Sequence, residues 1–326
     1  MDNHITNGRG YAIALASALV LATTAIFIRY LTETYRIPAL VLAWWRDGFV
    51  TLTLLLVLRL LRPRLLTVKR RHLGYLFGYG FVLAIFNALW TLSVALNGAA
   101  IATVLVYCST AFTALLARWL LKERLGWYKL LAILLCLGGC VFVADALDPG
   151  VWLVSSIGIL TGIIAGLGYA IYSLMGRSAA QRGLNPWSTL FYTFGFAAAF
   201  LLIFNLLPGG FLPGAASHPA DFFWLGDAFA GWGILFILAA GPTLLGFGLY
   251  NLSLSYLPSS VANLILTLEP VFTGLLAYSL LGERLNRLQI LGSLMVIGGV
   301  IFLRIFEKRV EELDEQDLTR EAEVLG

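Results

Sequence analysis

The sequence predicts an all-α polytopic membrane protein with ten transmembrane helices, arranged as two inverted five-helix repeats. The observations behind this are the composition, a series of apolar stretches and an internal duplication. Of the 326 residues, 60% are hydrophobic and 12% are charged, and the mean hydropathy is +0.86. Globular domains average roughly 45–50% apolar and about 25% charged residues. A water-soluble core of this size cannot bury so much apolar surface, so a bilayer must solvate it.

Ten stretches of about 20 apolar residues are each bounded by charges, Pro or Gly, which is the length that crosses a bilayer as a helix. The first, from Tyr11 to Leu31, is too long for a cleaved signal peptide and lacks a small-residue cleavage site after it. The predicted spans are 11–31, 38–60, 73–94, 99–120, 127–145, 153–175, 186–207, 231–254, 259–281 and 287–305.

The duplication is visible 160 residues apart. The segment FTALLARWLLKERL, Phe112–Leu125, returns as FTGLLAYSLLGERL, Phe272–Leu285, with ten of fourteen positions identical. A repeat of apolar segments at this period indicates two related halves of a membrane protein. We therefore divide the chain into a first five-helix repeat (1–148), a second repeat (149–306) and a tail (307–326).

Lys and Arg residues predict the orientation. They gather in the links after spans 2, 4 and 6 and at the C-terminal end, and these segments share one side if there are ten spans. By the positive-inside rule both termini are cytoplasmic. Five spans per half is an odd number, so the second half is inverted, and Glu123-Arg124 and Glu283-Arg284 lie on opposite sides of the membrane. The net charge of +4 follows from this bias and needs no nucleic-acid partner.

The paired LKER and LGER links, Glu269-Pro270 and the pairs Gly138-Gly139 and Gly298-Gly299 resemble the EamA family of the drug/metabolite transporter superfamily. The resemblance extends over residues 11–305. It implies a central cavity enclosed by spans 1–4 and 6–9, peripheral spans 5 and 10, and export of amino acids or other small metabolites, with aromatic amino acids in one branch. The first half has Ser109-Thr110 where the second has Glu269-Pro270.

Polar residues inside a membrane are costly and are therefore candidates for function. Thr103 and Tyr107 of span 4 lie on one helical face, and their copies in span 9 are Asn263 and Thr267. The two stripes either face a shared aqueous cavity or belong to small-residue helix packing.

Spans 3 and 8 carry a second matched set: Asn87, Trp90 and Thr91 lie on one face in the first half, and their copies in the second are Phe247, Tyr250 and Asn251. Aromatic rings beside an amide suit a small organic substrate with a flat or apolar end. The alternative is an interfacial aromatic belt or plain core.

Charged residues in the spans form the third group. Arg46 and Asp47 are neighbours about 100° apart on a helix, so one can face the cavity and bind a carboxylate while the other pairs with a neighbouring helix. A buried structural ion pair is the alternative. Glu269 is predicted to bind a substrate amine or a coupling proton, or to be structural together with Pro270. Gly241, Pro242 and Pro270 are the predicted hinges.

The sequence contains no HExxH, GxSxG or P-loop spacing, so we expect neither an enzyme nor a metal site or cofactor. The predicted function is a secondary transporter that exports small metabolites, amino acids including aromatic ones, by alternating access. The alternatives are a channel or facilitator for another metabolite or drug, and a non-transporting assembly or receptor protein. The expected partners are the substrate and the lipid of a bacterial-type plasma (inner) membrane, with the protein a monomer or homodimer.

Overall fold

The computed structural model describes residues 2–123, 125–143, 146–149, 156–207, 212–281, 286–303 and 305–306, and every regular element within these ranges is helical. Arg124, Glu283, Arg284 and the tail 307–326 lie outside the described residues. The long helices of the first half are α1 (Asp2–Leu21), α2 (Thr24–Thr34), α3 (Ala39–Leu61), α4 (Arg70–Tyr107), α5 (Ser109–Leu120) and α6 (Trp127–Val143). Those of the second half are α7 (Ser156–Gln181), α8 (Pro186–Asn205), α9 (Phe229–Leu238), α10 (Leu244–Ser253), α11 (Ser259–Leu266), α12 (Glu269–Leu281) and a last helix, Arg287–Leu303. Short turns of helix are η1 (Pro63–Leu66), η4 (Pro219–Phe223) and the π-helical η5 (Ala239–Thr243).

Seven segments of the described chain are helical, long and apolar enough to cross a membrane. They coincide with seven of the ten predicted spans. The other three predictions fall on shorter elements: Trp127–Val143, the pair α11 and α12, and Arg287–Leu303. The structure thus has the architecture of a polytopic membrane protein, while ten crossings and the inverted repeat stay predictions.

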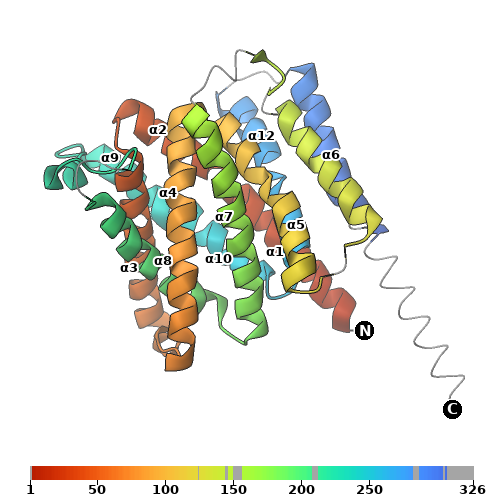
Figure 1. Cartoon of the computed structure of the whole chain (residues 1–326), viewed down its shortest axis with the longest axis horizontal. Helices are drawn as coiled ribbons and strands as arrows, with labels where there is room; N and C mark the ends of the chain where they lie inside the picture. The colour runs from red at the N-terminus through yellow and green to blue at the C-terminus, as the bar shows by residue number, and fades with distance from the viewer. Residues whose placement is uncertain are drawn as a thin grey trace, which may run out of the picture.

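The helices form one bundle in which segments from the two halves alternate (Figure 1). Helix α4 packs against α7 and α8, α3 against α8, and α1 against α10. Helix α6 and the last helix lie together at one edge of the bundle, where Cys136 Sγ lies 3.7 Å from the Val296 carbonyl. The two peripheral helices are therefore the ones that the family resemblance implies.

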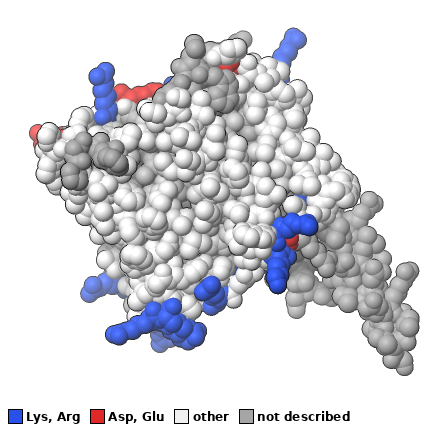
Figure 2. Space-filling model, viewed as in Figure 1, with Lys and Arg blue, Asp and Glu red and all other residues white. Residues whose placement is uncertain are grey.

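The outside of the bundle is apolar, as expected for a surface in contact with lipid. Large side chains such as Leu60, Trp119, Leu134 and Leu294 are exposed on it. Lys and Arg side chains gather mainly at the end that includes the N-terminus, seen at the bottom of Figures 1 and 2. We call this end the N-terminal face. The link between α3 and α4 lies at this end, as Figure 1 shows. There Ser188, at the start of α8, donates a hydrogen bond of 2.7 Å to the Leu65 carbonyl.

The helices are also interrupted inside the predicted spans. Spans 3 and 4 separate at Gly98 as predicted, because the backbone of α4 is non-helical there, with a φ of 75° that suits glycine; the second part of α4 ends at Tyr107. The predicted span 11–31 is divided between Leu21 and Thr24. Hydropathy depends on the polarity of the side chains, so it does not reveal a break in the backbone within a continuous apolar run.

At the opposite end, the link between α8 and α9 folds back over α3. The Trp45 indole donates a 2.6 Å hydrogen bond to the Phe222 carbonyl. The carboxylate of Asp221 accepts backbone N–H bonds from His218 and Ser217, and these bonds lower the pKa of Asp221. The described part of the link, residues 212–228, therefore lies beside the aromatic end of α3.

Candidate functional site

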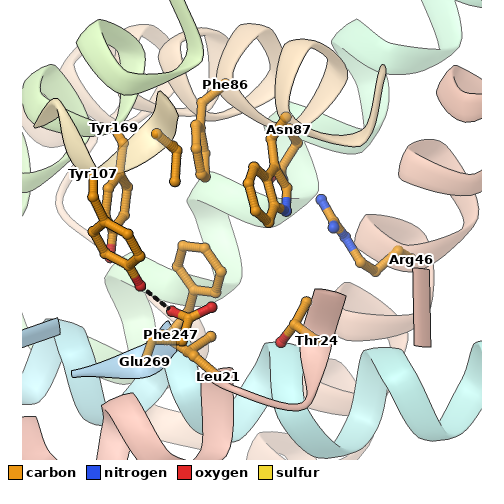
Figure 3. Close-up of a pocket in the computed structure, with 11 residues that line it drawn as sticks. Leu21, Thr24, Arg46, Phe86, Asn87, Tyr107, Tyr169, Phe247 and Glu269 are labelled. Carbon is orange, nitrogen blue, oxygen red and sulfur yellow. Dashed lines mark hydrogen bonds between the residues drawn. The ribbon is translucent and has the colours of Figure 1, made fainter. Parts of the chain in front are cut away.

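A central cavity lies where several helices are interrupted (Figure 3). Leu21 and Thr24 flank the break between α1 and α2, Tyr107 precedes the break at Cys108, and Glu269 follows the break at Thr267–Leu268. Broken helices free backbone groups and direct side chains inward at membrane depth. The lining residues are Leu21, Thr24, Arg46, Phe86, Asn87, Trp90, Val106, Tyr107, Tyr169, Phe247 and Glu269.

One wall of the cavity is a guanidinium held by its neighbours. Arg46 is almost fully buried, and its Nε lies 3.5 Å from Asp47 Oδ1, a long contact. Asp47 points away and accepts a 2.7 Å hydrogen bond at Oδ2 from Asn87 Nδ2 of α4. Arg46 Nη2 is buried without a hydrogen-bond partner among the described residues. Because an unpaired buried cationic donor is costly, this nitrogen is suited to an anionic ligand group.

Opposite this wall, as Figure 3 shows, is a carboxylate. Tyr107 Oη donates a 2.6 Å hydrogen bond to Glu269 Oε2. The tyrosine comes from α4 and the glutamate from the first turn of α12, so this bond joins the two halves of the chain. A partly buried carboxylate with one tyrosine partner can accept further hydrogen bonds from a cation or an ammonium group.

Aromatic rings fill the space between the two charged walls. Phe86 stacks on Tyr169 with ring centroids 5.0 Å apart, and the Phe247 ring lies 6.4 Å from Phe86. The cavity volume is about 40 Å³, counted as room for the centres of water molecules. This is room for a few waters and well below the roughly 300–1,000 Å³ of pockets that enclose drug-sized ligands. In this conformation the site is nearly closed.

A buried polar layer lies between the cavity and the N-terminal face, formed by Tyr79, Tyr172, Ser173, Tyr250, Asn251 and Asn263. Asn251 accepts a 3.2 Å bond from Tyr79 Oη and donates a 2.6 Å bond to Tyr172 Oη. Ser173 Oγ accepts from Tyr250 Oη at 2.6 Å and from Asn263 Nδ2 at 3.1 Å. Asn263 Oδ1 in turn accepts from Ser109 and Thr110. Donors and acceptors from both halves thus satisfy one another in this layer.

Of the ten predicted substrate-binding residues, five line the cavity, three belong to the buried polar layer and two belong to neither. Arg46, Asn87, Trp90, Tyr107 and Glu269 line the cavity. The remaining five are buried but do not line it: Tyr250, Asn251 and Asn263 belong to the buried polar layer, Thr267 Oγ1 donates to the Leu264 carbonyl at the end of α11, and Thr103 is buried within α4. Asn263 of the span 9 stripe therefore bonds to Ser109, Thr110 and Ser173 and does not line the cavity.

The predicted hinge residues lie at two of the interruptions. Gly241 and Pro242 are in the π-helical turn η5 between α9 and α10, where Thr243 Oγ1 donates to the Leu238 carbonyl at 2.8 Å. Proline has no N–H for that carbonyl, so the hydroxyl compensates for it. Pro270 is in the first turn of α12, directly after the break from α11, where proline is tolerated.

Sequence reasoning missed six lining residues: Leu21, Thr24, Phe86, Val106, Tyr169 and Phe247. Phe247 was noticed only as the copy of Asn87, and Thr24 had the signal of a hydroxyl inside a span. The apolar residues have no such signal, since an inward-facing Phe and a lipid-facing Phe look alike in sequence. Among the described residues, no group of three or more His, Cys, Asp or Glu could hold a metal ion.

Comparison with known proteins identifies relatives over nearly the whole chain. An uncharacterized transporter of Archaeoglobus fulgidus is 28% identical over 297 residues, which cover 90% of this chain and 95% of the relative. The uncharacterized transporter YyaM of Bacillus subtilis is 24% identical over 89% of this chain and 92% of its own. A solved crystal structure superposes with a TM-score of 0.73 at 16% identity, covering 93% of this chain and 99% of that one. This last similarity concerns the fold alone.

The model of the EamA-like transporter family matches the chain twice, over residues 8–144 and again over 156–305. These two matches include every residue that lines the cavity. The apolar helices and the relatives named as transporters agree with the match. The chain therefore belongs to the EamA-like transporter family and is an integral membrane transporter of small molecules.

Proposed function

We propose that this transporter exports amino acids, aromatic ones among them, by alternating access around the central cavity. The observation that supports this most directly is the pair of opposite charges on facing walls. Arg46 presents an unpartnered nitrogen, Glu269 presents a carboxylate, and aromatic rings lie between them. This arrangement complements a zwitterion with an apolar side chain.

Each part of an amino acid has a matching group. The planar fork of Arg46 suits the α-carboxylate, and Glu269 suits the α-ammonium group, with Tyr107 as its present partner. Phe86, Trp90 and the neighbouring rings provide apolar faces for the side chain. A substrate with a small side chain would not contact these rings, so an aromatic amino acid makes the most contacts in the site.

The cavity must widen to admit such a substrate, and alternating access provides that movement. Two successive matches to one family model support two related halves, and the odd number of predicted spans in each half supports their inverted arrangement. The π-helical turn at Gly241 and Pro242 and the break before Pro270 are the hinges of this proposal. The Lys- and Arg-rich N-terminal face is assigned to the cytoplasm of a bacterial-type inner membrane, with both termini on that side.

The test is uptake of radiolabelled phenylalanine into inside-out vesicles from cells that produce the protein. We expect uptake above that of empty vesicles, and Arg46→Ala is expected to lower the apparent affinity at least tenfold, because hydrogen bonds to charged groups contribute about 1.5–3 kcal/mol each. Arg29→Ala is the matched control, since Arg29 is exposed and pairs with Glu33 on its own helix.

Uptake that stays the same in Arg46→Ala would contradict the proposed site. If vesicles that contain normal amounts of folded protein take up none of the amino acids, the proposed substrate class would be contradicted. Single-channel currents in planar bilayers would instead favour a channel.

A further inference from the structure

A glutamate from one half of the chain caps a helix of the other half at the N-terminal face. Glu123, in the link between α5 and α6, accepts hydrogen bonds at Oε1 from Ser259 N (2.9 Å) and Ser259 Oγ (2.7 Å). At Oε2 it accepts from Ser260 N (3.3 Å) and Ser260 Oγ (2.6 Å). Four donors therefore converge on one carboxylate at the start of α11.

Helix α11 depends on this contact for its cap. The residue before it is Pro258, whose side chain makes no capping hydrogen bond. The first N–H groups of a helix have no partner within the helix, and a negative charge beside them is favourable. Glu123 supplies both the acceptors and the charge from outside the helix, and all eight residues of α11 are buried.

A second bond joins the same region. Arg177, near the end of α7, donates from Nη1 to the Leu254 carbonyl at 2.8 Å, at the beginning of the link to α11. Arg177 also lies within electrostatic range of Glu123. Helices α7, α10 and α11 and the α5–α6 link are thus held together at one face.

These contacts lie on the N-terminal side of the cavity and of the buried polar layer. Along α11 the order is Ser259 at the cap, Asn263 in the buried polar layer and then Glu269 in the cavity at the start of α12. Along α7 the same order appears in reverse, with Tyr169 in the cavity, Ser173 in the layer and Arg177 beside the cap. The capped helix ends therefore lie nearest the N-terminal face, followed by the layer and then the cavity.

The repeat does not carry the two serines and the arginine contact of this face to their copies in the first half. Under the 160-residue repeat, Ser259 and Ser260 correspond to Ala99 and Ala100, which have no hydroxyl to donate. The first parts of the two halves also align at an offset of 148 residues, where Ile37-Pro38 matches Asn185-Pro186. In this alignment Arg177 corresponds to Arg29, which pairs with Glu33 on its own exposed helix surface. The serine donors that bind Glu123 are therefore particular to the second half of the chain.

We propose that Glu123 is the latch of the transport cycle at the N-terminal face, and that release of α11 from Glu123 admits substrate from that side. This inference rests on the proposed alternating-access function, and it adds residues outside the substrate cavity to the cycle. A residue that only stabilised the fold would not control access from one side of the membrane.

The experiment measures side-specific exposure of the buried polar layer. In a background with Cys108, Cys136 and Cys140 replaced by serine, Ser173→Cys serves as a reporter for a membrane-impermeant maleimide. Because Glu123→Gln removes the charge and turns an NH₂ group toward the Ser260 donors, we expect labelling in inside-out vesicles to rise roughly tenfold or more, and labelling in right-side-out vesicles to stay the same. Glu33→Gln is the matched control and is expected to leave both rates unchanged.

Ser259→Ala combined with Ser260→Ala retains the charge and removes two donors, so a smaller increase of about threefold is expected from the same side. If Glu123→Gln fails to fold, this double variant decides the question. Unchanged labelling, or an equal increase from both sides, would overturn the latch. The readout needs no substrate, so failure of amino-acid transport with side-specific labelling would contradict the proposed substrate and leave the latch standing.

Discussion

Single residues determine the charge pattern of the cavity, and Asn87 is the clearest case. Its amide group fixes the Asp47 carboxylate, which frees Arg46 to face the cavity. Adjacent residues on a helix diverge by about 100°, so Asp47 cannot both pair closely with Arg46 and reach α4. The 3.5 Å separation within the pair, against 2.7 Å to Asn87, shows which partner the carboxylate favours.

Asn87→Ala is expected to lower the stability of the purified protein by about 1–3 kcal/mol, because it leaves a fully buried carboxylate oxygen without its donor. The measurement is the thermal unfolding midpoint in detergent. Thr91→Val on the same helix is the control, since the Thr91 hydroxyl donates only to the Asn87 carbonyl one turn earlier. Equal midpoints for Asn87→Ala and the wild type would show that Asp47 finds another partner.

At the scale of elements, close helix packing and helix interruption have different causes. Helix α6 and the last helix approach closely because glycines face one another, and a Cβ at Gly139 would lie 2.6 Å from the Gly292 carbonyl oxygen. The helices around the cavity are interrupted by Pro242 and by the breaks at Ala22–Thr23, Cys108 and Thr267–Leu268. Small residues thus hold the peripheral pair together, while the interruptions surround the region that must move.

Gly139→Ala is expected to destabilise the protein by about 1–3 kcal/mol, since a backbone oxygen cannot yield to the added methyl group without a shift of the helices. Gly298→Ala is the matched control, because a Cβ there meets nothing within 4 Å. Thermal unfolding of the two variants in the same detergent makes the comparison. A lower midpoint for Gly298→Ala than for Gly139→Ala would show that this interface is not the close contact of the structure.

At the scale of the whole molecule, the charge distribution and the latch concern the same face. Lys and Arg gather mainly at the N-terminal face, and Glu123, the proposed latch, binds the start of α11 at that end. A transporter that loads from the cytoplasm would then begin its cycle by opening the positively charged face. The ordered link around Asp221 covers the other end.

Two single-cysteine variants test this orientation, His72→Cys at the start of α4 and His218→Cys in the link before η4. Because an odd number of predicted spans separates them, we expect an impermeant maleimide to label His72→Cys only in inside-out vesicles. His218→Cys is expected to react only in right-side-out vesicles. Labelling of both from one side would rule out the proposed topology.

The membrane class, the positions of most spans and five cavity residues were predictable from sequence, because these properties are local. An apolar run of sufficient length must cross or enter the bilayer, and a charge such as Arg46 within it needs a special environment. The same polar signal was present in Tyr250, Asn251 and Asn263. They do not line the cavity, however, because they form hydrogen bonds with Tyr172 and Ser173.

The sequence by itself determined that the chain is a membrane protein with polar groups at matched depths in two related halves. Only the tertiary structure decided which of those groups face the cavity and which close it, and only it brought Glu123 to the start of α11 across 136 residues. The physical reason is that periodicity and hydropathy place a side chain on one helix, whereas hydrogen-bond partners depend on which helices meet. In a transporter the contacts between helices also change with the conformational state, and the residue pattern does not predict which contacts belong to the closed state.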